Sequence, residues 1–194
     1  ILVAVLVAAS ALAQAQRGPA PDPLIREGVT VKLGPHTHAI PDGGVPLVPN
    51  VGIVVGSRAT LVVDTGLGRR NGEAVLREVA KVSRNDLLYI VTTHFHAEHT
   101  MGYTAFPPSA QYVNSTIQEA EFDEGGMRQV ATFASRSPMT AELLNGATRR
   151  AAAVTFDREH VLDLGGVRAR LLVVGPTHTK GDTIVFVEGD GVLF

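Results

Sequence analysis

The chain has 194 residues, of which 45% are hydrophobic and 19% are charged, and this composition predicts one globular domain with enough apolar side chains for a core. The formal net charge is −2 and no basic stripe stands out, so a nucleic-acid partner has little electrostatic support and none is expected. The sequence contains no cysteine, which excludes disulfides, thiol nucleophiles and cysteine-bound zinc within these residues.

The N-terminal segment is apolar and carries no charge before Arg17. Its apolar run is shorter than the roughly 20 residues of a membrane span. We interpret residues 1–15 as a secretory signal peptide that lacks its basic start, with ALA or AQA as the cleavage site. The proline-containing residues 16–28 are expected to be a linker. This interpretation predicts an exported, periplasmic or secreted protein without a stable membrane span after cleavage; a buried N-terminal helix or an uncleaved anchor is the alternative.

The first half of the domain, from residue 29 onward, shows a strand-rich pattern with one amphipathic helix. In chain order, the expected elements are strands over residues 29–33, 36–40, 51–56, 59–66 and 86–94, with a helix over residues 69–83. A strand, a helix and a second strand in succession indicate a crossover between neighbouring parallel strands, with the helix packed on the sheet.

The second half mixes short helices with strands and ends inside an apolar run. The expected elements are a short helix over residues 99–106, a strand over 110–113, helical segments over 115–135 and 139–150, and strands within 160–176 and 182–194. Because the last run stops at Phe194 within an expected hairpin, we expect the domain to be incomplete at its C-terminus.

Three apolar runs end in polar side chains. LVVDTG contains Asp64, LLYIVTTH ends at His94, and LLVVGPTHTKGD leads into His178 and Asp182. Ligands of open α/β sheets bind beyond the carboxyl ends of the strands. We therefore expect these side chains to point toward a common site.

The segment TTHFHAEHTMG places three histidines and a glutamate within six residues. His94 and His96 are two residues apart, so in an extended segment both face the same side and could bind one ion. Glu98 and His99 follow and could bind a second ion with help from elsewhere. Zinc accepts this donor set, whereas magnesium and calcium prefer oxygen ligands; iron and manganese are alternatives. The competing interpretation is a group of surface or core histidines without a metal.

Three ordered motifs make the sequence resemble the metallo-β-lactamase superfamily. THFHAEH resembles its H-x-H-x-D-H signature, LVVDTG resembles its early strand that ends in aspartate, and GPTHTKGDTIVF resembles its G-x-T-x-G-D segment. The resemblance extends from about residue 29 to residue 194. It implies an α/β protein with an αβ/βα four-layer sandwich, of which the C-terminal part is missing here.

The resemblance also implies roles for individual residues. His94, His96 and His178 would hold the first metal ion, and Glu98 and His99 would contribute to a second. Two aspartates would support the site without binding metal: Asp64 would orient ligand histidines, and Asp182 would stabilise the loop that carries His178.

The sequence departs from the family pattern in two ways. Glu98 stands where the signature usually has aspartate, and the extra methylene shifts the carboxylate by a distance that matters in catalytic sites. An aspartate or cysteine after the last strand, and a late histidine, do not occur in these residues. We therefore expect a complete three-histidine site and an incomplete second site.

The expected function is an exported metallo-hydrolase with one or two zinc ions, in which a metal-bound hydroxide attacks an amide, ester, thioester or phosphoester of a small molecule. The expected catalytic residues are His94, His96, His178 and Glu98, and Glu98 would also orient the water. β-Lactam hydrolysis is a candidate reaction, although Glu98 argues against a typical lactamase. The alternatives are a mononuclear iron oxidoreductase on the same fold and a periplasmic metal-binding protein without catalytic activity.

Overall fold

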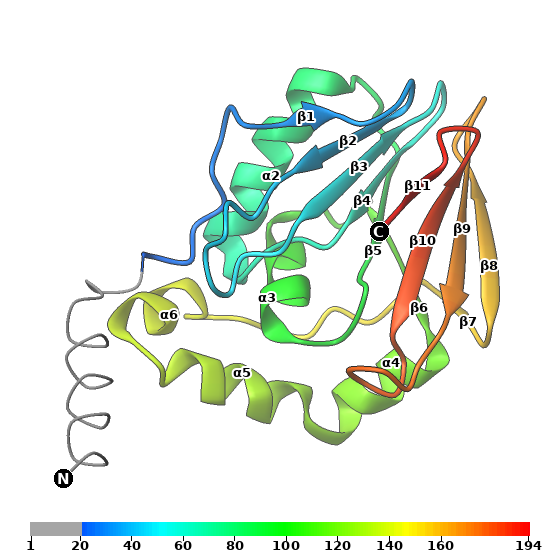
Figure 1. The fold of residues 1–194 in the computed structure, drawn as a ribbon. Helices are drawn as coiled ribbons and strands as arrows, with labels where there is room; N and C mark the ends of the chain where they lie inside the picture. Colours follow the sequence, from blue (N-terminus) through cyan, green and yellow to red (C-terminus); the bar gives the residue numbers. More distant parts are fainter. Residues whose placement is uncertain (1–20) are drawn as a thin grey trace, which may run out of the picture.

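Two β-sheets pack face to face, and helices cover the other face of the larger sheet (Figure 1). The computed structural model describes residues 21–194. The expected signal peptide, residues 1–15, and the start of the expected linker, residues 16–20, lie outside the described residues. None of the helices within residues 21–194 combines the length and the hydropathy that a membrane span requires.

The larger sheet has seven strands in the order of the chain. These are β1 (Val31–Lys32), β2 (Thr37–Ile40), β3 (Val51–Val55), β4 (Thr60–Val63), β5 (Leu88–Val91), β6 (Gln111–Ser115) and β7 (Val154–Phe156). Strands β1 to β4 form an antiparallel meander, and β4 to β7 pair in parallel. The parallel pairing of β4 with β5 through one intervening helix confirms the expected crossover.

The crossover helix α2 (Gly68–Val82) agrees with the expected helix to within one residue at each end. Its apolar stripe, which includes Ala74, Val75 and Val79, is buried in the core between the helices and the larger sheet. The same face buries two polar side chains that hold the N-terminal segment. Asn71 accepts a hydrogen bond from the Ile25 amide at 2.8 Å, and Glu78 accepts one from the Gly28 amide at 2.8 Å. Residues 21–28 of the expected linker therefore lie against α2.

The remaining helices are short and lie between β5 and β7. They are α3 (Ala97–Thr100), the 3₁₀ helix η1 (Met101–Ala105), α4 (Thr116–Glu121), the π-helical turn η2 (Phe122–Gly126), α5 (Met127–Ala134) and α6 (Pro138–Leu143). The expected helix over residues 139–150 is wrong in its second half, because α6 ends before Gly146. That glycine has a φ of 69°, a left-handed conformation typical of the position just after a helix.

The smaller sheet is antiparallel throughout, in the order β11-β10-β9-β8. Its strands are β8 (Glu159–Asp163), β9 (Arg168–Val173), β10 (Thr183–Glu188) and β11 (Val192–Leu193). Leu171 and Val185 on its inner face pack with Leu61 and Val91 of the larger sheet in a second core. The two cores join three layers, namely the helices, the larger sheet and the smaller sheet. This arrangement confirms the α/β class and contains three of the four expected layers.

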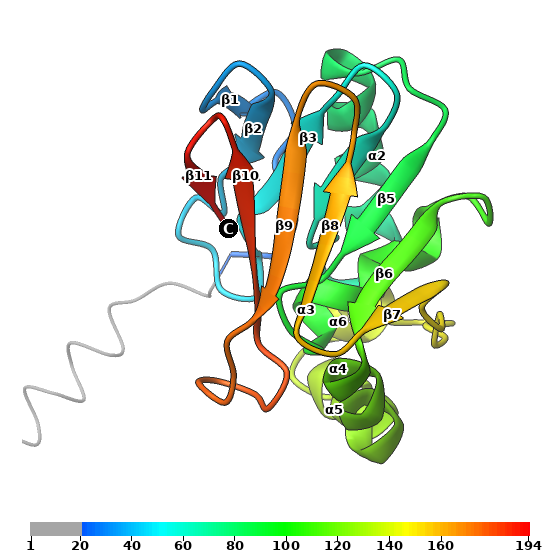
Figure 2. The ribbon, with the colours of Figure 1, turned by 90° about the vertical axis from the view of Figure 1, so that its right-hand side faces the viewer.

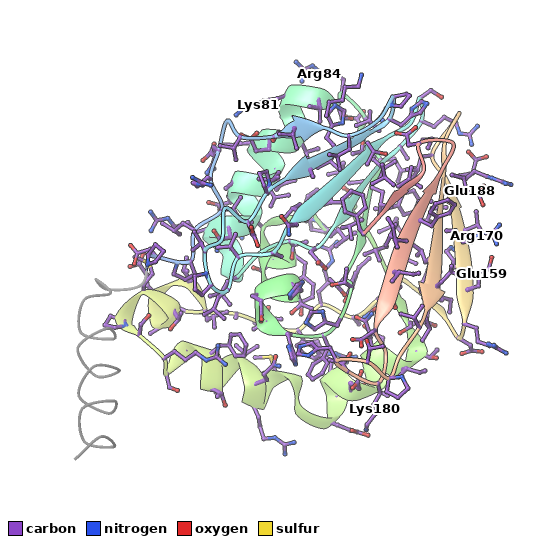
Figure 3. The ribbon with its side chains drawn as sticks, viewed as in Figure 1. Lys81, Arg84, Glu159, Arg170, Lys180 and Glu188 are labelled. Carbon is purple, nitrogen blue, oxygen red and sulfur yellow. The ribbon has the colours of Figure 1, made fainter. Side chains whose placement is uncertain are left out.

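The outer face of the smaller sheet carries a ladder of charges (Figure 3). Arg170 pairs with Glu159 at 3.1 Å and with Glu188 at 2.9 Å. Figure 2 shows this sheet toward the viewer, and within residues 21–194 no helix lies over it. The fourth layer of the expected sandwich is thus not among the described residues.

Candidate metal centre

Loops that follow strands of both sheets meet at one end of the molecule. Asp64 directly follows β4, His94 lies three residues beyond the end of β5, and His178 lies in the loop between β9 and β10. Backbone hydrogen bonds connect these segments to one another. The Asp64 amide donates to the Val91 carbonyl at 2.9 Å, and the Thr183 amide donates to the Thr93 carbonyl at 2.8 Å. The second bond links the two sheets beside the histidines.

Three histidines form a compact group of nitrogen donors. One ring nitrogen from each of His94, His96 and His178 lies within 4.8 Å of the others, and His96 Nδ1 is 3.1 Å from His178 Nε2. The rings meet nearly edge to face, with centroids 4.7–4.9 Å apart. Nitrogens bound tetrahedrally to one zinc ion at about 2.0–2.1 Å lie roughly 3.3 Å from one another. The His96–His178 separation is close to this value and the other separations are at most 4.8 Å, so the three donors could hold one metal ion after a small adjustment.

The surroundings keep two of these histidines neutral. Burial lowers the pKa of His94 to about 3, with a further contribution from the nearby His99. Burial also lowers the pKa of His96 to about 4, assisted by the neighbouring His178. Metal binding requires the neutral imidazole, so protons compete weakly for these two side chains near pH 7.

A buried aspartate organises the histidines. Asp64 is 2% exposed and accepts hydrogen bonds from the Thr93 amide at 2.8 Å, the Thr93 hydroxyl at 2.9 Å and His99 Nδ1 at 2.8 Å. Burial alone would lower the pKa of His99, but the Asp64 carboxylate outweighs burial and raises the pKa. Asp64 therefore orients His99 directly and contacts the rest of the centre through Thr93.

Thr93 connects Asp64 to His94. The Thr93 hydroxyl donates its single proton to Asp64, and its oxygen lies 3.2 Å from His94 Nδ1. We therefore assign the proton of neutral His94 to Nδ1, which leaves Nε2 as the nitrogen with a free lone pair. Sequence reasoning missed Thr93, because a threonine beside a histidine carries no distinctive pattern.

Glu98 and His99 follow the first two histidines in sequence, and the His99 ring centroid lies 4.0 Å from that of His94. The structure does not include either side chain among the converging donors. Glu98 Oε2 is buried and has no hydrogen-bond partner among the described residues. A buried carboxylate oxygen without a donor is costly. A cation is a fitting partner for such an oxygen, so the residues that are present are compatible with a second metal site at Glu98.

A second buried aspartate shapes the loop that carries His178. Asp182 accepts hydrogen bonds from the amides of Thr177 at 3.1 Å, His178 at 2.5 Å and Thr179 at 3.0 Å, and also from both threonine hydroxyls. Burial alone would raise the pKa of Asp182, but these donors hold it well below its usual range. Both carboxylate oxygens are thus engaged within the loop, which leaves the metal-binding role to His178.

A cavity of about 620 Å³ lies between the N-terminal segment, the loop between β2 and β3, and the start of α6. Leu47 and Met139 contribute apolar walls, and Arg136 lies on its border. The Arg136 guanidinium stacks over the Phe133 ring at 3.7 Å, and the Phe133 ring centroid is 6.4 Å from that of His96. Arg136 and Phe133 therefore lie between the cavity and His96, and none of the three histidines lines the cavity.

Comparisons with known proteins identify the family and support the fold. The sequence model of the metallo-β-lactamase superfamily matches residues 44–194. The structure resembles FEZ-1, a metallo-β-lactamase from Legionella gormanii, with a TM-score of 0.65, 15% identity and coverage of 90% of this chain and 63% of that one. No protein with a curated description matches the sequence.

Two further solved structures have similar scores. BJP-1, a subclass B3 metallo-β-lactamase of Bradyrhizobium japonicum, has a TM-score of 0.64, 18% identity and coverage of 91% of this chain and 65% of that one. LRA-12, a class B3 di-zinc metallo-β-lactamase from an Alaskan soil metagenome, has a TM-score of 0.65, 15% identity and coverage of 88% and 61%. The chain thus spans less than two thirds of the length of each of these three proteins, and the likeness concerns the fold.

Proposed function

The chain belongs to the metallo-β-lactamase superfamily, and we propose that it is a zinc-dependent hydrolase that cleaves an amide, ester, thioester or phosphoester bond of a small-molecule substrate. The observation that carries this proposal is the group formed by His94, His96 and His178, whose donor nitrogens lie within 4.8 Å of one another. β-Lactams are candidate substrates because FEZ-1, BJP-1 and LRA-12 are β-lactamases.

The chain's own residues would divide the work as follows. His94, His96 and His178 would hold the first ion, and Glu98, which has one buried carboxylate oxygen, would contribute with His99 to a second. Zinc bound there would supply a Lewis acid and lower the pKa of a water molecule that it binds toward 7. Asp64 fixes the orientation of His99 and, through Thr93, the tautomer of His94. This preorganisation means that the ligands need little rearrangement when the ion binds.

The cavity that Arg136 borders suits a substrate with an apolar body and an anionic group. Its volume falls within the range of small-molecule sites, roughly 300–1,000 Å³. Arg136 has no acidic partner within ion-pair distance in residues 21–194, whereas Glu142, which also lines the cavity, pairs with Arg70 at 3.5 Å. A guanidinium that stacks on an aromatic ring and lacks a carboxylate partner suits bidentate binding of an anion.

The proposal includes export to the periplasm or the medium, and no nucleic-acid partner. Export depends on the apolar residues 1–15, which have the composition of a signal peptide. N-terminal sequencing of the mature protein from an exporting host would test it. A start near residue 14 or 16 would support cleavage, and a mature protein that retains residue 1 in the cytoplasm would contradict it.

The test of the catalytic proposal combines metal analysis with turnover. The purified protein should contain zinc and hydrolyse at least one of four substrate types: a lactam, an aryl ester, a thioester or a phosphodiester. His178→Ala should lose both zinc and hydrolysis. His160→Ala is the matched control, because His160 stacks on Phe156 at a centroid distance of 5.8 Å, outside the histidine group, and should retain both.

Two outcomes would replace the proposal by another. Stoichiometric iron with redox turnover and no hydrolysis would indicate the oxidoreductase alternative. Tight metal binding without turnover on any substrate would indicate a metal-binding protein. Hydrolysis that survives His178→Ala would refute the role of the three-histidine group.

A further inference from the structure

The distance between His94 and His178 depends on contacts between segments that are remote in sequence. His94 follows β5 of the larger sheet, whereas His178 belongs to the loop between β9 and β10 of the smaller sheet. A short helix, α4 (Thr116–Glu121), lies beside this loop at the lower end of both sheets in Figure 1. We propose that Gln118 and Glu121 of α4 are positioning residues that hold the His178 loop against the His94 strand end and thereby set the affinity for the metal. This inference rests on the proposed metal centre.

Gln118 bridges the two segments with its side-chain amide. The residue is 0% exposed. Its Nε2 lies 3.0 Å from the Thr92 carbonyl on the His94 side, and 3.1 Å from the Gly181 carbonyl and 3.0 Å from the Thr183 hydroxyl on the His178 side. Its Oε1 accepts from the Thr92 hydroxyl at 3.1 Å. Two amide protons are therefore shared between both ligand-bearing segments, in a site that excludes water.

Glu121 holds the same loop from the next turn of α4. One of its carboxylate oxygens accepts from the Lys180 amide at 2.8 Å, and the other accepts from the Gly181 amide at 2.9 Å. Asp182 accepts from the three preceding amides, those of residues 177–179. Every backbone N–H from residue 177 to residue 181 thus donates to one of two carboxylates, and His178 lies within this run.

The contact between α4 and the loop is too close for a larger residue at position 181. A Cβ on Gly181 would lie 2.8 Å from Gln118 Cγ and 2.8 Å from the backbone nitrogen of Gln118. Figure 3 shows Lys180 at this lower end, and its ammonium pairs with Glu124 at 3.1 Å. The loop is therefore in van der Waals contact with α4, and the position of the loop depends on the side chains of that helix.

When a histidine is already held in place before the ion binds, less conformational entropy is lost on binding. Mutation of residues that support metal ligands commonly changes metal affinity by about 10–100-fold. Neither Gln118 nor Glu121 is among the converging metal donors, so their influence passes through the loop. This differs from the role of Asp182, whose bonds shape the loop internally but make no contact with the His94 strand end.

The test is a measurement of zinc affinity by chelator competition, at a temperature where each variant is folded. Gln118→Met keeps the approximate size of the side chain and removes its donors and acceptor, and Glu121→Gln replaces one acceptor by a donor. Each should weaken zinc binding by about 10–100-fold. The absorption bands of the cobalt-substituted protein should also change, because His178 is less well placed. Val79→Ala, in the buried face of α2, is the control that lowers stability without touching the loop.

The outcomes separate this inference from the proposed function. Loss of zinc binding in His178→Ala, with wild-type affinity and cobalt spectra in both α4 variants, would overturn the inference and leave the metal centre intact. Equal loss of affinity in Val79→Ala would overturn it as well, because stability alone would then explain the effect. Failure of the wild type to bind zinc would overturn both.

Gly181→Ala offers a second perturbation if Gln118→Met does not fold. It leaves both α4 side chains in place and pushes the loop away from them. Weaker zinc binding in this variant supports the inference, and unchanged binding contradicts it.

Discussion

Replacement of Asp64 by asparagine should remove the acceptor oxygen that His99 and the Thr93 hydroxyl share. Asparagine keeps an oxygen for the Thr93 amide, now at 2.8 Å. Its amide nitrogen takes the place of the oxygen that accepts from His99 Nδ1 at 2.8 Å and from the Thr93 hydroxyl at 2.9 Å. The hydroxyl can donate instead to the remaining oxygen, which lies 3.2 Å away. A buried hydrogen bond to a charged group contributes about 1.5–3 kcal/mol. Asp64 has a φ of 62°, which asparagine tolerates well. The free energy of unfolding should therefore fall by about 2 kcal/mol.

Alanine at the same position should cost considerably more. It leaves the Thr93 amide, the Thr93 hydroxyl and His99 without their acceptor, and it places a residue other than glycine, asparagine or aspartate in the left-handed region. The sum is roughly 4–6 kcal/mol, which is comparable with the total stability of many domains. Asp64→Ala should therefore be partly unfolded under conditions where Asp64→Asn is folded.

The measurement is urea unfolding of the metal-free protein together with an NMR titration of His99. The folded-state pKa of His99 is raised, so the stabilisation is fully present below about pH 6.5 and is lost as the pH rises through the folded-state value. The difference between wild type and Asp64→Asn should be larger at pH 5.5 than at pH 8.5, and the pKa of His99 should fall in the variant. Equal stability of the two proteins at pH 5.5, or equal losses in the asparagine and alanine variants, would refute this reasoning.

Three further predictions concern the surroundings of the centre. The pKa values of His94 and His96, about 3 and about 4, lie below the unfolded-state value near 6.5. The metal-free protein should therefore lose stability as the pH falls from 6.5 toward 4, by up to about 1.4 kcal/mol per pH unit for each group. A free energy of unfolding in urea that does not change over this pH range would contradict this. Asp182→Asn should cost roughly 2–3 kcal/mol and weaken zinc binding, as checked by thermal melts and chelator competition, because the loop amides lose a charged acceptor. Arg136→Ala should raise KM for anionic substrates and leave neutral esters of the same size unaffected; an equal change for both would argue against an anion subsite.

Local pattern was enough to predict the helix α2 and its two flanking strands. Ala74, Val75 and Val79 recur at helical spacing, and β-branched runs lie on both sides, so the helix could be placed to within one residue and the flanking strands to within three. The pattern failed at residues 144–150, where composition still favours a helix. There a glycine with a left-handed backbone follows α6, and this effect is local but easily missed.

Within the candidate centre, the proximity of His94 and His96 follows from their spacing, since adjacent ligands on one extended segment need no tertiary information. The hydrogen bonds from Asp182 to its own loop are local in the same sense. The tertiary structure alone decided that Asp64 binds His99, that the buried oxygen of Glu98 lacks a partner, and that Gln118 bridges the two sheets. Burial periodicity and short-range hydrogen bonds leave a signature in neighbouring residues. Contacts between remote side chains depend on how whole elements pack, and no short stretch of sequence encodes that packing.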